Sequence, residues 1–182
     1  AQMMTNFAAG GSAVNVLGRH YGVTVEIVDC GVGRPTRNFV WEPALSSAEL
    51  DGHLAAGKEL ARLAATRFTI VGVGDMGIGN TTAASAITAA LLDLRAADVT
   101  GTGSGLDIDE LSHKVRIIEK SLDFHGPSAR RGRGVLETFG GHEIARLAGF
   151  LLGAAELRLP VMLDGFITTA AALAATRLDP AV

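Results

Sequence analysis

Residues 68–82, FTIVGVGDMGIGNTT, determine how the rest of the chain is interpreted. An apolar run passes into a segment with four glycines in eight residues, which ends in Asn-Thr-Thr before an alanine-rich stretch. This order predicts a strand, a tight loop and a helix whose N-terminal N–H groups and positive dipole end favour an anion. Because glycine lets the backbone close around a ligand, we predict a phosphate-binding cradle, residues 72–82. The residues predicted to contact the phosphate are Gly77, Gly79, Asn80, Thr81 and Thr82.

Two nucleotide-binding motifs overlap in the cradle, and each is incomplete. Residues 72–77, GVGDMG, match GxGxxG, but a dinucleotide fold also needs an acid at the end of a second strand about 20 residues later. Asp93 has nearly that spacing, yet it ends a predicted helix. Residues 74–81 spell a Walker A loop with Asn80 in place of the lysine, which argues against triphosphate chemistry. The sequence therefore favours a site for one phosphate on a smaller ligand.

Length and composition predict one α/β domain over residues 1–182. The formal net charge of −3 argues against a nucleic acid partner, and no apolar run is long enough to predict a membrane span. A lone cysteine and scattered histidines predict no metal site. No basic segment precedes an apolar run at the N-terminus, so we expect a cytoplasmic protein. The sequence from Ala1 to Val182 is interpreted as a piece of a longer chain.

Strands predicted on either side of the cradle end in acidic residues. Residues 23–28, VTVEIV, lead to Asp29, and residues 160–163, PVML, lead to Asp164. The carboxyl ends of parallel strands meet at one edge of a sheet. We therefore expect the carboxylates of Asp29, Asp75 and Asp164 to gather around the cradle.

The remaining chain predicts helices joined by two polar loops. An amphipathic pattern over residues 2–20 is interrupted at Gly10-Gly11, and residues 45–67 form a strong helix that Ser46 or Ser47 caps. A second glycine-rich loop, DVTGTGSGLDID over residues 98–109, is either another anion-binding nest or a simple connector.

Three further patterns bear on charged side chains. Asp109 is predicted to cap a helix ending at Leu122, with Lys114 away from its apolar face. Residues 126–134 form a basic loop, for which solvent exposure is favoured over a phosphate clamp. His142 begins an HExxH-like sequence, but Arg146 replaces the second histidine, which predicts no zinc site.

Four blocks of this sequence resemble one known family. They are VGVGDMGIGNTT, the GTGSG loop with HKVRII, FGGHEIARLAGFLLGAA, and PVMLDGFITTAAALAA. Together they resemble nicotinate-nucleotide:dimethylbenzimidazole phosphoribosyltransferase of cobalamin biosynthesis, over nearly all 182 residues. The resemblance implies a Rossmann-like three-layer α/β domain with a mostly parallel sheet, in a homodimer. The family's small domain, built from both chain ends, is expected to be missing here.

The resemblance also implies a reaction. The family moves the phosphoribosyl group of nicotinate mononucleotide to a nitrogen of 5,6-dimethylbenzimidazole or a related azole base, without cofactor or metal. The products are α-ribazole 5′-phosphate and nicotinate. The protein must hold the phosphate, place both rings across C1′ and accept a proton. The family's proton acceptor is a glutamate in a GEGSGA-like motif near the C-terminus, which this sequence does not contain.

The resemblance assigns roles at several positions. Asp75 stands where the family has an acidic residue, usually glutamate, and is a candidate auxiliary base. Lys114 stands where the family has a lysine near the phosphate. The other residues predicted to bind substrate are Gly103, Ser104 and Asp164.

Two other functions stay open from the sequence. One is a module that binds a nucleotide or a benzimidazole without turnover, which the missing glutamate motif favours. The other is an NAD-dependent dehydrogenase, which rests on GxGxxG alone.

Overall fold

A computed structural model describes residues 2–103, 105 and 107–182. The chain divides into two compact units, Ala1–Pro35 and Thr36–Val182. Each unit is described by itself below. One domain over residues 1–182 stays a prediction.

The first unit contains two short helices, α1 (Gln2–Ala8) and α2 (Ala13–Tyr21), and the predicted interruption between them is confirmed. Ser12 caps α2, which ends at Gly22 with a φ of 68°. The predicted strand over residues 23–28 is wrong, since this segment has no regular structure. β-branched residues favour an extended backbone, but a strand also needs a hydrogen-bonding partner. In the described part of the chain, the strand ladder joins β1 and β2 alone.

Asp29 accordingly does not end a strand of that sheet, and this expectation is also wrong. Its Oδ1 accepts hydrogen bonds from the backbone N–H groups of Gly31 at 2.7 Å and Val32 at 2.8 Å. The carboxylate therefore stabilises a local turn.

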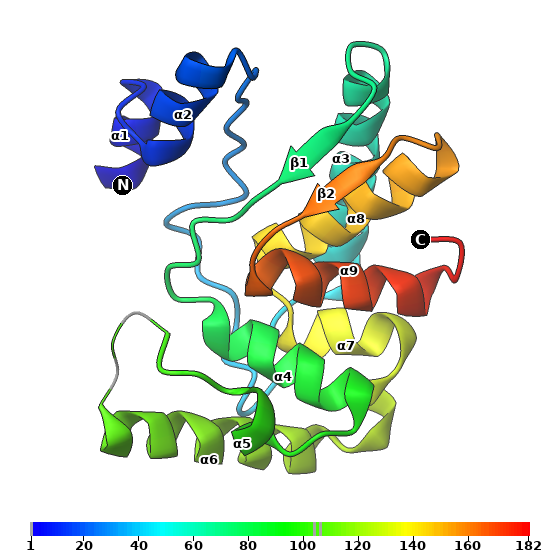
Figure 1. Cartoon of the computed structure of the whole chain (residues 1–182). Coiled ribbons are helices and arrows are strands. Elements are labelled where there is room, and N and C mark those ends of the chain that lie inside the picture. The colour runs from blue at the N-terminus through cyan, green and yellow to red at the C-terminus, as the bar shows by residue number, and fades with distance from the viewer. Residues whose placement is uncertain (1, 104, 106) are drawn as a thin grey trace. The chain divides into compact units, whose positions relative to one another are not determined.

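The second unit is built on a parallel pair of strands, β1 (Val71–Val73) and β2 (Val161–Leu163), drawn side by side in Figure 1. Val71 pairs with Val161 and Val73 with Leu163. The segments that follow, beginning at Gly74 and Asp164, therefore leave the sheet at the same edge. The predicted α/β class with a parallel sheet is confirmed for this small sheet.

Helices cover one face of this pair. The predicted helix over residues 45–67 is confirmed as α3 (Ser47–Ala65), and it packs mainly on α8 (His142–Glu156). Helix α9 (Phe166–Leu178) contacts α8, α4 (Thr81–Leu92) and α7 (Gly132–Phe139). Below α4 in Figure 1 lie α5 (Ala96–Val99) and α6 (Ile108–His125), and η1 (Pro127–Arg130) connects α6 to α7.

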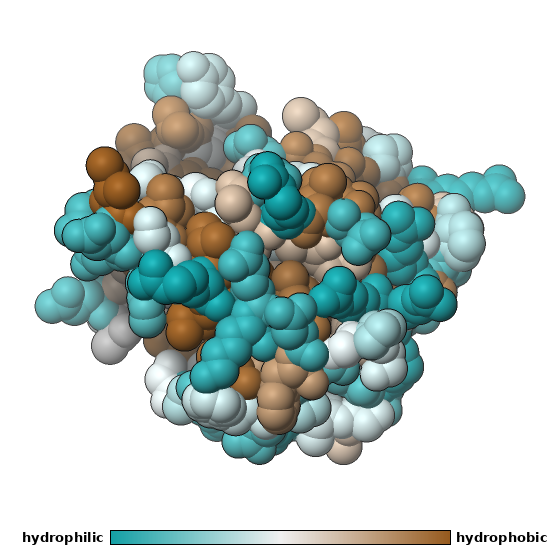
Figure 2. All heavy atoms as spheres, turned by 90° about the horizontal axis from the view of Figure 1, so that it is seen from below, coloured by the Kyte–Doolittle hydropathy of each residue, from teal (hydrophilic) through white to brown (hydrophobic). Residues whose placement is uncertain are grey.

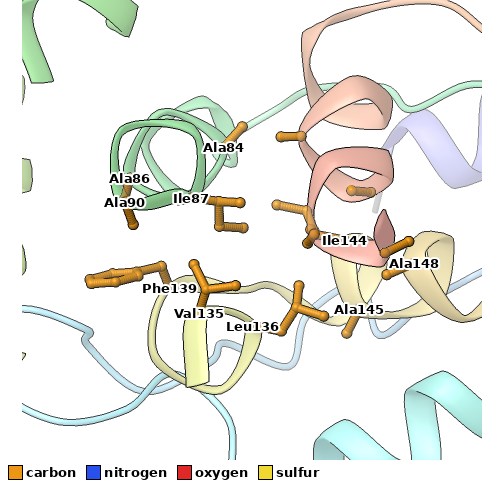
Figure 3. Close-up of a cluster of buried hydrophobic side chains, with 14 of the residues drawn as sticks. Ala84, Ala86, Ile87, Ala90, Val135, Leu136, Phe139, Ile144, Ala145 and Ala148 are labelled. Carbon is orange, nitrogen blue, oxygen red and sulfur yellow. The ribbon is translucent and has the colours of Figure 1, made fainter. Parts of the chain in front are cut away.

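The core between these helices is made largely of small side chains. Figure 3 shows Ile87 of α4 pointing toward Val135 and Phe139 of α7, whereas Ala84 points away from α7. Ala84, Ile87, Val135 and Phe139 are all 0% exposed. The alanines let α4 approach its neighbours closely, which fixes the helix that carries the cradle.

Two sequence expectations about α6 and α7 are corrected. Asp107, and not Asp109, caps α6, because Asp107 and Glu110 form a reciprocal capping box with bonds of 2.8 and 3.0 Å. The predicted loop over residues 126–134 is a 3₁₀ helix followed by the first turn of α7.

Polar and apolar side chains are interspersed on the face of the molecule that Figure 2 shows from below. Within the described residues, no helix combines the length and the apolar character needed to cross a bilayer.

Candidate phosphate-binding site

The cradle backbone joins β1 to α4. Gly77 and Gly79 have φ values of 71° and 82°, a left-handed conformation that glycine adopts without strain. Asn80 is the N-cap residue of α4, but no side chain forms a cap hydrogen bond there. The first-turn N–H groups of a helix have no partner within that helix. The N-terminus of α4 therefore has the backbone arrangement that binds phosphate in other proteins.

The amide of Asn80 braces the loop instead of capping the helix. Its Nδ2 donates to Asp75 Oδ2 at 2.9 Å and to Glu143 Oε1 at 3.1 Å. The same Asp75 oxygen accepts the N–H of Gly77. The Asn80 Oδ1 atom is buried and has no partner among the described residues. Asp75 is thus part of the loop's internal bonding, and Asn80 connects it to α8.

Glu143 was not selected from the sequence. It lies in the first turn of α8, where an acidic side chain is favoured by the helix dipole. That position would have suggested a structural role, but its contact with Asn80 spans 63 residues of sequence and has no local signal.

Lys114 is buried beside the start of α4, at 8% exposure. Its Nζ donates to Thr81 Oγ1 at 2.8 Å and to the Gly101 carbonyl at 3.3 Å. The expectation that Lys114 lies away from the apolar face is wrong, because it precedes buried Ile118 by one helical turn. Burial lowers the pKa of the Lys114 ammonium.

No carboxylate among the described residues forms an ion pair with Lys114, and its hydrogen-bond partners there are neutral oxygens. A buried cation is costly unless it is paired with an anion. The ammonium and the uncapped N-terminus of α4 therefore provide two positive elements next to Thr81. Together they form an arrangement that suits an anion.

The second glycine-rich loop approaches the same place. Gly103 has a φ of 57°, and a Cβ added to it would lie 3.3 Å from Thr81 Oγ1 and 3.7 Å from Lys114 Nζ. Ser104 lies outside the described residues. An adjacent pocket of about 520 Å³ lies along the start of α6. Its lining residues are Thr82, Asp109, Glu110, His113, Lys114 and Ile117.

The remaining predicted residues lie along the chain that leaves the sheet edge. Gly77, Gly79, Thr81 and Thr82 belong to the cradle and α4, and Asp164 directly follows β2. Asp164 is exposed, and its main-chain carbonyl accepts the Thr168 hydroxyl at 2.6 Å.

A histidine pair lies at the contact between α3 and α8. His53 Nε2 and His142 Nδ1 are 2.8 Å apart, and Arg146 lies 3.2 Å from His53 Nδ1. Burial lowers the pKa of His53, and the nearby His142 and Arg146 lower it further. The described residues contain no group of three or more His, Cys, Asp or Glu side chains arranged to hold a metal ion.

These features define an α/β protein with a glycine-rich loop and an uncapped helix start at the carboxyl edge of a parallel strand pair. A family model described as Phosphoribosyltransferase matches residues 1–182, and the chain belongs to this family. The resemblance and the fold class inferred from the sequence are thereby confirmed.

Relatives agree with this assignment. The chain is 46% identical to the nicotinate-nucleotide--dimethylbenzimidazole phosphoribosyltransferase of Roseiflexus sp. (strain RS-1), over 100% of this chain and 56% of the relative. Identity to the protein of the same name from Geotalea uraniireducens is 44%, with the same coverage. A crystal structure of the Thermus thermophilus phosphoribosyltransferase of that kind superposes with a TM-score of 0.87 at 36% identity, over 98% of this chain and 57% of that one. The chain thus spans somewhat more than half the length of these relatives.

Proposed function

We propose that this chain supplies the phosphoribosyl-binding part of an enzyme that transfers phosphoribose from nicotinate mononucleotide to 5,6-dimethylbenzimidazole. The products are α-ribazole 5′-phosphate and nicotinate, in synthesis of the cobalamin lower ligand. The observation that carries the proposal is the buried Lys114 ammonium at the uncapped start of α4, without a carboxylate partner among the described residues. Family membership supplies the substrates.

The 5′-phosphate occupies the cradle in this proposal. Backbone N–H groups of residues 78–82 donate to it, since the Gly77 N–H already donates to Asp75. The Thr81 hydroxyl turns toward the phosphate, and Lys114 balances its charge. Gly79 and Gly103 permit the close approach of the backbone. The ribose then extends toward the edge where β1 and β2 end.

The two carboxylates at that edge have different roles. Asp75 already accepts hydrogen bonds from Gly77 and Asn80, so it orients the cradle and acts only as an auxiliary base. Asp164 is exposed at the end of β2 and contacts the transferred group or the acceptor ring.

A calorimetric titration with nicotinate mononucleotide tests the phosphate site. Lys114→Ala should weaken binding by about 1 to 3 kcal/mol, the range for a lost charge-assisted hydrogen bond. Lys120→Ala is the matched control, because Lys120 lies on the same helix and its Nζ stacks over Trp41 instead. Equal affinities for all three proteins, each folded by circular dichroism, would refute the assignment of Lys114.

The transfer itself is tested by incubating the protein with both substrates and separating ribazole phosphate by chromatography. Product that depends on Lys114 supports the enzyme. A second candidate, a module that binds the nucleotide without turnover, is favoured by the two hydrogen bonds that already engage Asp75. Tight nucleotide binding with no product would support that candidate.

The proposal also includes a cytoplasmic homodimer. The support for the dimer is the exposure of large apolar side chains near the sheet edge, including Ile78 at 74% and Met162 at 63%. Sedimentation at micromolar concentration tests this, and a monodisperse monomer would contradict the dimer.

A further inference from the structure

A second pocket lies at the opposite end of α4 from the cradle. It has a volume of about 530 Å³. The residues of this arginine pocket are Ala90, Leu91, Asp93, Pro127, Arg130, Arg131, Gly132 and Arg177. Since α4 rises about 1.5 Å per residue, its last turn lies roughly 15 Å from Asn80. The arginine pocket is therefore separate from the proposed nucleotide site.

The positive charges of this pocket are poorly compensated. The side chains of Arg131 and Arg177 form no hydrogen bond or ion pair with any described residue. Arg130 donates to the Leu122 carbonyl at 3.2 Å, and its Nε is buried without a partner in the described chain.

The ion pairs of Arg130 do little to offset this charge. They are long, 3.9 Å to Asp93 and 3.8 Å to Asp123, and these aspartate side chains are 95% and 86% exposed. Pairs of this kind contribute little. Three guanidinium groups thus line one pocket in a chain whose formal net charge is −3.

The position of Arg131 is unfavourable by itself. It is the N-cap residue of α7, its side chain forms no cap bond, and a cation at the positive end of a helix is disfavoured. Arg177 lies in the last turn of α9, where the dipole does favour a cation, so it needs no ligand to explain it. By contrast, Arg133 in the first turn of α7 is paired with Asp51 and Glu137. A bound anion would explain why Arg131 has no such carboxylate.

We infer that the arginine pocket binds a phosphate ester. The guanidinium groups of Arg130, Arg131 and Arg177 would hold the phosphate, since planar guanidinium groups match phosphate oxygens in pairs. Ala90, Leu91 and Pro127 form an apolar wall of the same pocket and suit the organic part of the ester.

Calorimetric titration with phenyl phosphate and with inorganic phosphate tests the pocket. The background is Lys114→Ala, so that the cradle contributes little to the heat. Arg131→Ala/Arg177→Ala should weaken phenyl phosphate binding by at least about tenfold, as the loss of charge-assisted bonds predicts. Arg116→Ala is the matched control, because it removes one exposed positive charge from α6 outside the pocket. Inorganic phosphate should bind more weakly than phenyl phosphate, because it lacks the apolar part.

Two results would overturn the inference. One is the absence of phenyl phosphate binding to the Lys114→Ala protein up to millimolar concentration. The other is equal affinity with and without the two arginines, in proteins that melt at the same temperature. Neither result concerns nicotinate mononucleotide binding at the cradle. The proposed function is tested separately, by the titration of the wild-type protein with nicotinate mononucleotide.

Discussion

Glycines serve opposite purposes in two regions of this molecule. At the contact between α3 and α8, a Cβ added to Gly57 would overlap the backbone of Arg146 and Phe150. In the cradle, a Cβ added to Gly72, Gly74 or Gly79 would meet no atom within 4 Å. In the first region glycine lets two helix backbones come together. In the second region the missing side chains leave open space beside the loop.

The packing of α3 on α8 is reciprocal. A Cβ on Gly149 would overlap Leu54, and one on Gly153 would lie 2.8 Å from the Cα of Lys58. These contacts repeat along both helices, so neither helix can shift without breaking several of them. The cradle has no comparable contacts, and its shape depends on left-handed glycines and on the hydrogen bonds of Asp75 and Asn80. We therefore expect the stability of the protein to depend mainly on the helix pair and the proposed nucleotide binding to depend on the loop.

The largest expected effect is on the helix pair. Gly57→Ala should destabilise the protein by about 3 kcal/mol, because the new methyl group would be placed against backbone atoms that cannot rotate away. Urea denaturation followed by circular dichroism measures the change.

Gly52→Ala is the matched control in the same helix, since a Cβ there meets nothing within 4 Å. It should stabilise α3 by about 0.5 to 1 kcal/mol through helix propensity. Equal effects of the two substitutions would show that close backbone packing does not hold α3 on α8.

A second substitution, at Lys114 beside the cradle, tests the cost of a buried cation to stability. Lys114→Met should raise the free energy of unfolding by about 2 kcal/mol at pH 7, since it removes a buried cation and keeps the side chain's length. Burial lowers the pKa of Lys114 from 10.5. The buried ammonium therefore destabilises the folded protein fully below this lowered pKa, and the destabilisation disappears as the pH rises toward 10.5. The advantage of the variant should therefore shrink in alkaline solution.

Denaturation of both proteins between pH 7 and pH 10.5 measures this difference. Lys120→Met controls for the loss of one lysine, because Lys120 is exposed. If the stability advantage of Lys114→Met grew with pH, the predicted direction of the pH dependence would be wrong. If Lys114→Met were less stable than wild type at every pH, the ammonium would stabilise the fold.

Features that depend on neighbouring residues could be predicted from the sequence. The order of β1, cradle and α4 followed from one stretch. The start of α3 was predicted at Ser46 or Ser47, and Ser46 is the cap, with Glu49 three residues later completing the capping box. Strand β2 was also found, because an apolar run ending in Asp164-Gly165 has a local signature.

Features that depend on distant residues could not be predicted from the sequence. Residues 23–28 have strand-forming side chains, but pairing is decided by a partner elsewhere in the chain. Lys114 was placed away from the core because a lysine breaks an apolar pattern, whereas its position opposite Thr81 involves a residue 33 positions away. The cap of α6 was missed although its signal is local, because Glu110 follows Asp107 by three residues and completes a capping box with it.

A third prediction concerns the start of α3. Ser46→Ala should cost about 1 kcal/mol at pH 7, since it removes one half of the capping box. The backbone N–H and hydroxyl of Ser46, together with Arg37, lower the pKa of Glu49 from 4.5 to about 2. Stabilisation by the Glu49 carboxylate is thus complete above pH 4.5 and is lost as the pH falls toward 2.

Thermal melts of wild type and Ser46→Ala between pH 7 and pH 2 measure both effects. Ser112→Ala is the control, because that hydroxyl only donates to the Ile108 carbonyl within α6. A constant difference over this pH range would mean that Ser46 acts without Glu49.

The smallest expected effect on stability is in the cradle, and it tests the comparison most directly. Gly74→Ala should change the free energy of unfolding by less than about 0.5 kcal/mol, because its φ is not left-handed and its Cβ would point into open space. If that space receives the phosphoribosyl group, the same methyl group should weaken nicotinate mononucleotide binding several-fold. Gly72→Ala is the control, because Gly72 lies within β1. It should change neither the free energy of unfolding nor nicotinate mononucleotide binding. If the Gly74→Ala protein bound the nucleotide as tightly as wild type, the ligand would not occupy the space beside Gly74. That space would then result from the conformation of the turn alone.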